Sequence, residues 1–314
     1  MDFLSIGDTA VDTFIKLKDA EVHCDINNEH CTISMRFGDK IPFESATIIP
    51  AVGNAANAAV AAKRLGLSSS YLAWVGKDRD GEDCLSALTK EGIDTKHISV
   101  QEGKQTNSHY VLWYGNERTI LIKHEEFECA LPEPLPSPKA VYLSSLSEHA
   151  LPLHDEVASW LEHDPGILLA FQPGTFQIKA GMQRLERIYR RADIFFANKE
   201  EYQRVLGSAE ESEKKLLAMM QARGPKTCFL TDGPKGAYAL SSAGETFKIS
   251  QYPDTKPPLE RTGAGDAFAS TATIALLLGK SAEEALMWGP INSMAVVQDI
   301  GAQRGLLSKE ALME

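Results

Sequence analysis

Strand-like and helix-like runs alternate along most of this chain, and this alternation limits the fold more than any other feature of the sequence. Strands separated by helices pair in parallel, and the helices then pack on both faces of the sheet. We therefore predict an α/β fold with a doubly wound, mostly parallel central sheet flanked by helices. The predicted strands are Phe3 to Gly7, Tyr71 to Val75, Ala140 to Leu143, Ile167 to Phe171, Ile194 to Ala197 and Cys228 to Thr231, and the predicted helices are Ala55 to Leu65, Asp83 to Glu91, His154 to Glu162 and Ile178 to Tyr189.

Two segments break this alternation, residues 13–50 and residues 105–123. They contain polar and β-branched runs such as CTISMRF and YVLWYG, which favour strand pairs without helices. We therefore predict a small β lid built from these two segments. The α/β core is then formed by residues 1–12, 51–104 and 124–314.

Charge and composition exclude several classes of partner. The formal net charge of −11 argues against nucleic acid, whose backbone is bound by clustered Lys and Arg. No apolar run approaches the roughly 20 residues that cross a bilayer, and the first residues lack the pattern of a secretory signal. The five cysteines are scattered and include no CxxC pair, so we expect reduced thiols in a cytoplasmic protein.

The segment TGAGDAF, from Thr262 to Phe268, carries the clearest chemical signal. Gly263, Ala264 and Gly265 are small enough for a phosphate to approach the backbone, and an apolar, helix-like run follows them. The start of a helix offers unpaired N–H groups and a positive dipole end. An anion-binding turn is therefore predicted here.

Asp266 stands in this turn, where a carboxylate would repel a phosphate. Its presence is explained if a substrate hydroxyl lies between them and gives its proton to Asp266 as its oxygen attacks phosphorus. The alternative is that Asp266 only caps the helix. A dinucleotide-binding glycine loop fits poorly, because the hydrophobic strand that should precede such a loop is absent.

With these residues in view, the chain resembles the PfkB or ribokinase-like family of carbohydrate and nucleoside kinases. The resemblance runs from about residue 3 to residue 308. TGAGDAF is its most specific element, and four weaker blocks precede it in the family's order. These blocks are VGNAANAA at Val52 to Ala59, WVGKDRDG at Trp74 to Gly81, NKEE at Asn198 to Glu201 and TDGPKG at Thr231 to Gly236.

The resemblance implies a role for each matching position. Asp266 is the catalytic base, and Gly263, Ala264 and Gly265 form the anion hole. Asp12, Gly53 and Asn57 bind the acceptor, and Glu201 with Asn198 holds Mg²⁺. Thr231, Gly233, Gly236 and Asn292 line the nucleotide side. Without the resemblance, Asp12 is equally a turn residue and Glu201 a solvated helix start.

Departures from the family pattern leave two points open. Glu260 replaces the usual Asp at the start of the motif, a position that often helps to shape a monovalent-cation loop, so dependence on K⁺ stays open. Arg261 occupies a variable position, where a phosphate contact and a solvent-facing side chain are both plausible.

The exposed edges of an open β lid favour a homodimer.

The expected activity is transfer of the γ-phosphoryl group of ATP to a hydroxyl, a primary alcohol, of a sugar or nucleoside. ATP and Mg²⁺ are the implied cofactors, and a small-molecule acceptor is the implied partner. The rival interpretation is a non-catalytic sugar- or nucleotide-binding regulator on the same fold. Neither interpretation names the acceptor.

Overall fold

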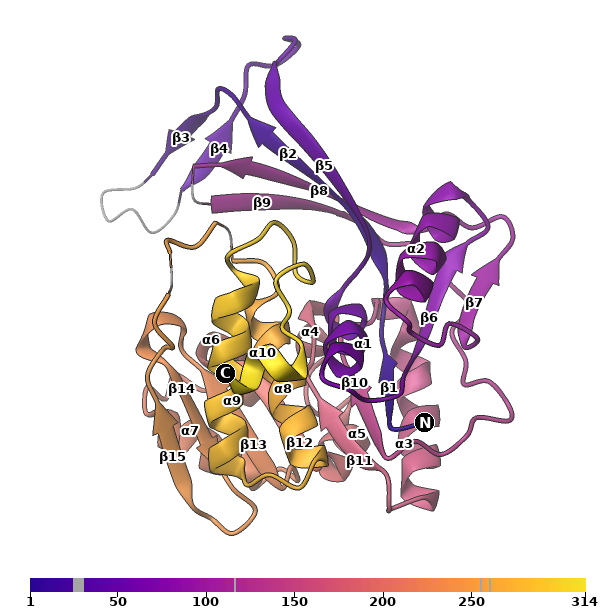
Figure 1. The fold of residues 1–314 in the computed structure, drawn as a ribbon, viewed down its shortest axis with the longest axis vertical. Helices are drawn as coiled ribbons and strands as arrows, with labels where there is room; N and C mark the ends of the chain where they lie inside the picture. Colours follow the sequence, from indigo (N-terminus) through magenta and orange to yellow (C-terminus); the bar gives the residue numbers. More distant parts are fainter. Residues whose placement is uncertain (25–30, 116, 255, 260) are drawn as a thin grey trace.

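The protein is built on a nine-stranded sheet (Figure 1). The structure is a computed structural model, and it describes residues 1–24, 31–115, 117–254, 256–259 and 261–314. The strand order is β15-β14-β13-β12-β11-β10-β1-β6-β7, and every pair from β7 to β13 is parallel. The predicted doubly wound, mostly parallel sheet is therefore confirmed. The strands are β1 (Phe3–Ile6), β6 (Ser69–Gly76), β7 (Ile98–Gln101), β10 (Ala140–Leu143), β11 (Leu168–Phe171), β12 (Ile194–Asn198), β13 (Thr227–Thr231), β14 (Ala237–Leu240) and β15 (Thr246–Ile249).

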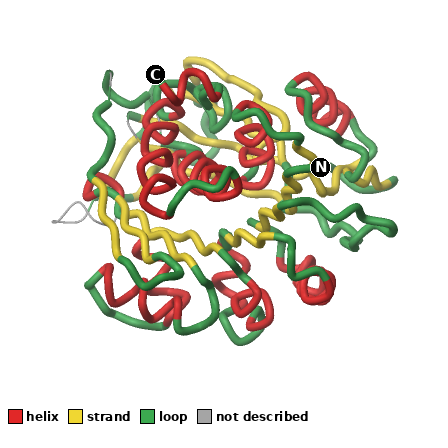
Figure 2. The backbone as a smooth tube through the Cα atoms, turned by 60° about the horizontal axis from the view of Figure 1, so that its bottom comes forward, coloured by secondary structure: helices red, strands yellow, loops and turns green. Residues whose placement is uncertain are grey.

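Helices cover both faces of this sheet (Figure 2). Alternate strand residues supply the two cores: Leu4 and Ile6 pack on one side, and Phe3 packs on the other. One face carries α3 (Leu151–His163), α4 (Thr175–Ala180), α5 (Glu186–Arg191), α6 (Lys199–Leu206) and α7 (Glu213–Gln221), and the other carries α1 (Asn54–Arg64), α8 (Ala264–Leu277), α9 (Ala282–Val296) and α10 (Lys309–Met313). Within the described ranges, no helix combines the length and the apolar character that crossing a bilayer requires.

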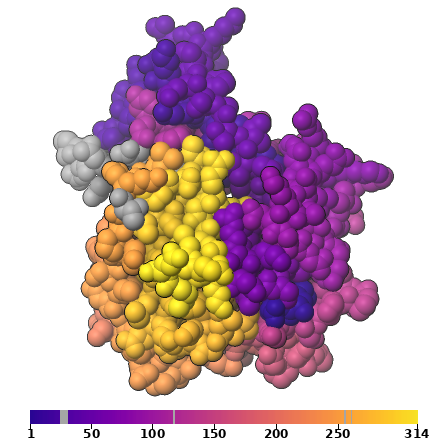
Figure 3. All heavy atoms as spheres, in the orientation of Figure 1, coloured from indigo at the N-terminus to yellow at the C-terminus, as the bar shows by residue number. Residues whose placement is uncertain are grey.

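A second sheet of four strands stands above the core and contains the segments predicted as a lid (Figures 1 and 3). Its order is β5-β2-β8-β9, with β2 and β8 parallel and the outer pairs antiparallel. Its strands extend beyond the predicted segments, because β2 begins at Ala10 and β5 ends at Val52. The strands are β2 (Ala10–Leu17), β5 (Phe43–Val52), β8 (Asn107–Tyr114) and β9 (Glu117–Lys123), and a hairpin of β3 (Glu21–His23) and β4 (Thr32–Ser34) extends from the lid.

Two details of the predicted helices were wrong. The single helix expected from Ile178 to Tyr189 is divided, because Gly181 adopts a positive φ of 84° and ends α4. The helix expected from Asp83 begins earlier, as α2 (Arg79–Lys90), where the Asp78 side chain accepts a hydrogen bond from the Gly81 N–H. Local glycine and cap chemistry, rather than apolar periodicity, sets both boundaries.

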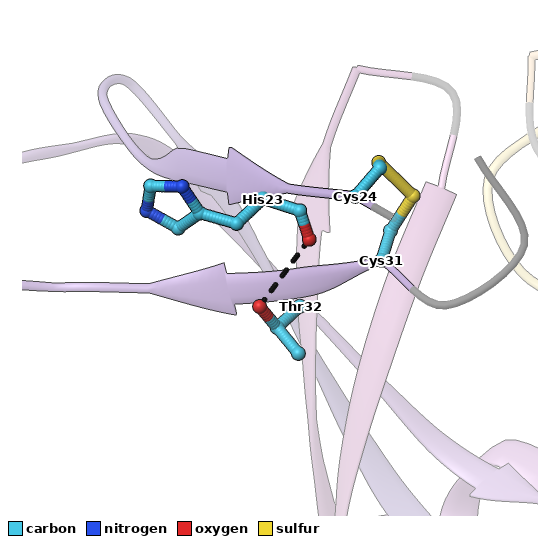
Figure 4. Close-up of a disulfide and its surroundings, with 4 residues drawn as sticks. All are labelled: His23, Cys24, Cys31 and Thr32. Atoms are coloured by element: carbon cyan, nitrogen blue, oxygen red, sulfur yellow. Dashed lines mark hydrogen bonds between the residues drawn. A yellow bond between two sulfur atoms is a disulfide. The ribbon is translucent and has the colours of Figure 1, made fainter. Parts of the chain in front are cut away.

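The expectation of five reduced thiols was also wrong, because Cys24 and Cys31 form a disulfide (Figure 4). These residues follow β3 and precede β4, and antiparallel pairing of the two strands brings their Cα atoms to 4.0 Å. CxxC spacing does not reveal this disulfide, because Cys24 and Cys31 are brought together by the pairing of β3 and β4 and not by their spacing in the sequence. Cys84, Cys129 and Cys228 are free thiols.

Candidate active site

A cleft of about 910 Å³ opens at the carboxyl ends of β12 and β13. In doubly wound proteins this edge of the sheet is the usual place for a ligand. Most of the residues that line the cleft come from four parts of the sequence, residues 196–201, 229–237, 261–269 and 290–297. The lining is completed by Asn54, Gln172, Ser250, Gln251, Tyr252, Asp254 and Pro258. The fold therefore brings the NKEE, TDGPKG and TGAGDAF segments to one site.

The turn before α8 has the backbone geometry of an anion site. Gly263 precedes the helix with a φ of 81°, and a Cβ atom there would lie 2.6 Å from the Cα atom of Ala302. The backbone N–H groups of Ala264, Gly265 and Asp266 have no hydrogen-bond acceptor among the described residues. Space is open beside Gly265, where an added Cβ would meet nothing within 4 Å. Three unpaired donors thus lie at a helix start whose residues line the cleft.

Asp266 lies half-buried on the floor of the cleft, between two side-chain amides. Its Oδ2 accepts a hydrogen bond of 2.8 Å from Asn57, and its Oδ1 accepts one of 3.2 Å from Gln172. Burial raises the pKa of Asp266 above the ordinary aspartate value, and these two hydrogen bonds oppose the rise. The arrangement suits a carboxylate that accepts a proton.

Glu201 and Asn198 form a reciprocal cap at the start of α6. The Glu201 N–H donates to Asn198 Oδ1, and the Asn198 N–H donates to Glu201 Oε2, each at 2.9 Å. Burial raises the pKa of Glu201, and the nearby charge of Asp266 adds to this effect. No described residue donates a hydrogen bond to Oε1, so this oxygen is available for a water or for a hard cation such as Mg²⁺. Within the described ranges, no group of three or more His, Cys, Asp or Glu side chains is placed to hold a metal.

The predicted nucleotide residues Thr231, Gly233 and Gly236 lie together along the cleft wall. Both glycines have positive φ values, 49° and 94°, and a Cβ atom at Gly236 would collide with the carbonyl oxygen of Ile249. The wall also includes Lys199, which the sequence analysis missed. Its Nζ atom pairs with Glu213 at 2.9 Å and with Glu211 at 3.1 Å. Lys199 directly follows the end of β12, and this position in the sequence could have indicated that it lies at the cleft.

Asn292 does not line the cleft. It is fully buried in α9, where its amide donates to Thr271 Oγ1 at 2.8 Å and accepts from the Leu307 N–H at 2.9 Å. These bonds tie α9 to α8 and to the C-terminal segment. Ser293 and Met294, one and two residues further on, face the cleft instead.

Asp12 lies on β2 and Gly53 directly precedes α1, where the lid joins the core, and neither residue lines the cleft. Asp12 Oδ1 lies 3.0 Å from His109 Nδ1, and the His109 ring centroid lies 5.3 Å from that of His124. His109 Nε2 is buried without a hydrogen-bond partner among the described residues. Gly53 has a φ of 125°, and a Cβ there would lie 2.6 Å from the carbonyl oxygen of Asp8. This group of carboxylates and imidazoles can bind a polar ligand.

An open cleft with a carboxylate beside unpaired helix-start N–H groups is compatible with a phosphotransferase. The model of the pfkB family of carbohydrate kinases matches residues 45–309, so the chain belongs to that family and is a carbohydrate or nucleoside kinase. The ribokinase of Haemophilus influenzae is 25% identical over 270 residues, which are 83% of this chain and 86% of that protein. The family and the enzyme class predicted from the motifs are confirmed.

Solved structures with the ribokinase fold match nearly the whole chain. The nucleoside kinase of Methanocaldococcus jannaschii superposes with a TM-score of 0.81 at 20% identity, covering 100% of this chain and 97% of that one. The ribokinase of Arabidopsis thaliana, in complex with ribose and ATP, gives 0.80 at 17% identity, covering 99% and 97%. The predicted ribokinase-like fold with its small separate sheet is confirmed.

Proposed function

We propose that this protein transfers the γ-phosphoryl group of ATP to a primary hydroxyl of a sugar or nucleoside. The acceptor oxygen bonds to the γ-phosphorus, its proton passes to Asp266, and the bond from phosphorus to the bridging oxygen breaks, which releases ADP. The N–H groups of Ala264 and Gly265 stabilise the charge on the transferring group. The single observation that carries this proposal is the half-buried Asp266 carboxylate beside a helix start with free donors.

A panel of acceptors tests this proposal directly. Ribose, fructose, other hexoses and nucleosides such as adenosine are each incubated with ATP and Mg²⁺, and ADP release is measured. We expect at least one acceptor to raise ADP release far above the rate without acceptor. A rate that no acceptor changes would favour the rival role, a regulator that binds sugar or nucleotide without catalysis.

Mg²⁺ is proposed to bind near Glu201 and Asn198, where it would neutralise the triphosphate. We expect Glu201→Gln to raise the Mg²⁺ concentration for half-maximal activity by about 10- to 100-fold. Glutamine still caps the helix, so α6 should keep its start. The matched control is Glu200→Gln, an exposed neighbour in the same helical turn, which should leave the Mg²⁺ requirement unchanged. Equal requirements in both variants would remove Glu201 from the metal site.

The acceptor is proposed to lie against Asp12, Gly53 and Asn57. We expect His109→Phe to raise the KM for the acceptor by about tenfold, because Asp12 loses the imidazole that holds its carboxylate. The KM for ATP should not change. The control is Tyr110→Phe, since Tyr110 is the next residue on β8 and points to the opposite face of the lid. An unchanged acceptor KM in His109→Phe would place the acceptor elsewhere.

The lid, residues 13–50 and 105–123, is proposed to cover the acceptor and to pair two copies of the chain. Strand register places Ile48, Tyr110 and Leu121 in one row on the lid face opposite Asp12, and their exposed fractions are 67%, 50% and 53%. Such a row favours burial in a homodimer.

Sedimentation velocity tests this pairing. We expect a dimer for the wild-type protein and a monomer for Leu121→Lys, because a buried lysine opposes association. Val100→Lys is the control, since Val100 is an exposed apolar residue on β7 of the core, outside the lid. A monomeric wild-type protein would contradict the pairing.

Two further expectations concern the surroundings of the enzyme. A kinase that consumes ATP works where ATP is supplied, so we propose the cytoplasm, where the exposed Cys24–Cys31 bond would be open to reduction.

Glu260, on which the expectation about K⁺ depends, lies outside the described residues. Activity in K⁺ compared with activity in Na⁺ decides whether a monovalent cation is a cofactor.

A further inference from the structure

The amide of Asn57 has only one orientation compatible with its neighbours. The backbone carbonyl of Ala51 can only accept a hydrogen bond, so the Gln303 atom 2.7 Å from it is the amide nitrogen. This nitrogen also lies 2.9 Å from Asn57, so the atom that it meets there is the acceptor Oδ1. Asn57 must therefore present its NH₂ group to Asp266, at 2.8 Å. A fixed peptide carbonyl thus determines which atom faces the carboxylate.

A second amide approaches the other carboxylate oxygen, and a buried tyrosine hydroxyl holds its oxygen end. The Tyr142 hydroxyl donates to Gln172 Oε1, and Gln172 Nε2 donates to Asp266 Oδ1. Tyr142 is fully buried in β10, so its ring has little freedom to turn its hydroxyl away from Gln172. Each oxygen of Asp266 therefore receives one N–H donor, and each keeps one lone pair for another partner.

We propose that Gln303 and Tyr142 are positioning residues, which lock the amides of Asn57 and Gln172 so that both donate to Asp266. Neither residue faces a reacting atom; each acts through the amide in front of it. The consequence is that two N–H donors favour the ionised form of Asp266 in a half-buried site, while each oxygen keeps a lone pair for an incoming hydroxyl. Its use in catalysis depends on the proposed function, in which Asp266 takes the hydroxyl proton, whereas the two locks do not.

Gln303 links the C-terminal segment to α1 across 246 positions of sequence. Figure 3 shows the yellow C-terminal residues packed directly beside the purple N-terminal part of the core. Sequence motifs identify Asn57 and Asp266 separately, but the residue that orients Asn57 lies outside both motifs. The lock at Gln303 is therefore formed only in the folded chain.

The test measures the ionisation of Asp266 without any substrate. The protein is labelled with ¹³C at aspartate carboxyl groups, the Asp266 resonance is assigned with Asp266→Asn, and its titration midpoint is followed by NMR. In Gln303→Glu an acceptor replaces the donor, so Asn57 turns its NH₂ group away from Asp266. We expect the midpoint of Asp266 to rise by about 1 to 2 pH units, since the carboxylate loses one hydrogen bond.

Matched variants separate orientation from charge. Arg304→Gln makes the same change in net charge at the next, exposed residue and should move the midpoint far less. Tyr142→Phe should also raise the midpoint. Tyr202→Phe should not raise it, because the hydroxyl that it removes is also buried but donates to the backbone carbonyl of Phe229. Gln303→Leu serves if Gln303→Glu does not fold. A midpoint in Gln303→Glu equal to that in Arg304→Gln overturns the lock at Gln303, and an unmoved midpoint in Tyr142→Phe overturns the second lock.

Steady-state kinetics then test whether the lock at Gln303 affects catalysis. With an acceptor from the panel, the acid limb of the kcat/KM profile should move to higher pH in Gln303→Glu, with the plateau at high pH retained. A purely structural defect would lower kcat/KM equally at every pH. If no acceptor is phosphorylated, the proposed function fails, yet the NMR titration still decides whether the amides hold Asp266.

Discussion

Replacing Asp266 by asparagine is expected to lower kcat by on the order of 10² to 10⁴, because asparagine keeps the shape of the side chain but cannot take the hydroxyl proton. The affinity for ADP, measured by calorimetry, should stay close to that of the wild type, since the glycines that line the nucleotide side are untouched. Steady-state kinetics with the preferred acceptor measures the loss. Turnover near the wild-type rate would remove Asp266 from the role of base.

The matched control is Asp254→Asn, at an exposed position that also lines the cleft. It should leave kcat unchanged, because Asp254 bonds only to Gln251 among the described residues. The pH dependence follows from the raised pKa of Asp266: the carboxylate is the active form, so the rate should fall as pH decreases through that raised value. In Asp266→Asn this acid limb should disappear.

Gly263→Ala is expected to destabilise the fold by about 2 to 5 kcal/mol, from the left-handed backbone and from overpacking against Ala302. This is a large part of the stability of an ordinary domain. Chemical denaturation with urea measures the loss. Activity should fall with it, because the donors of Ala264 and Gly265 follow directly after this residue.

Gly265→Ala is the natural comparison, since an added methyl group there meets no atom within 4 Å. Its free energy of unfolding should equal or exceed that of the wild type, because alanine favours a helix. Its KM for ATP should nevertheless rise, because the methyl group occupies the space proposed for a phosphate. If both variants were equally stable and equally active, the turn before α8 would be neither a tight turn nor an anion site.

The sequence predicted those parts of the molecule whose cause is local. TGAGDAF contains its own turn, helix start and acid within seven residues, and the helix start expected at Glu201 is the beginning of α6. The parallel order of the sheet follows from the alternation of strands and helices, which restricts how the chain can connect them. Contiguous chemistry of this kind requires no knowledge of the tertiary fold.

The missed parts depend on the relative placement of distant segments. Asn292 was assigned to the nucleotide side by resemblance alone, which does not show that its side chain lies buried between α9 and α8. His109 comes beside Asp12 only through the parallel pairing of β2 and β8, and Cys24 meets Cys31 only through the β3 and β4 hairpin. Gln303 reaches Asn57 across nearly the whole chain.

Phosphorus NMR of one reaction mixture tests the central claim most directly. The enzyme is incubated with ATP, Mg²⁺ and the best acceptor of the panel, and the spectrum is followed with time. We predict a new phosphomonoester resonance that grows at the same rate as ADP, with little inorganic phosphate, and no such resonance with Asp266→Asn over the same period. Inorganic phosphate as the main product, or an ester formed equally well without the Asp266 carboxylate, would contradict a base-assisted transfer to an alcohol.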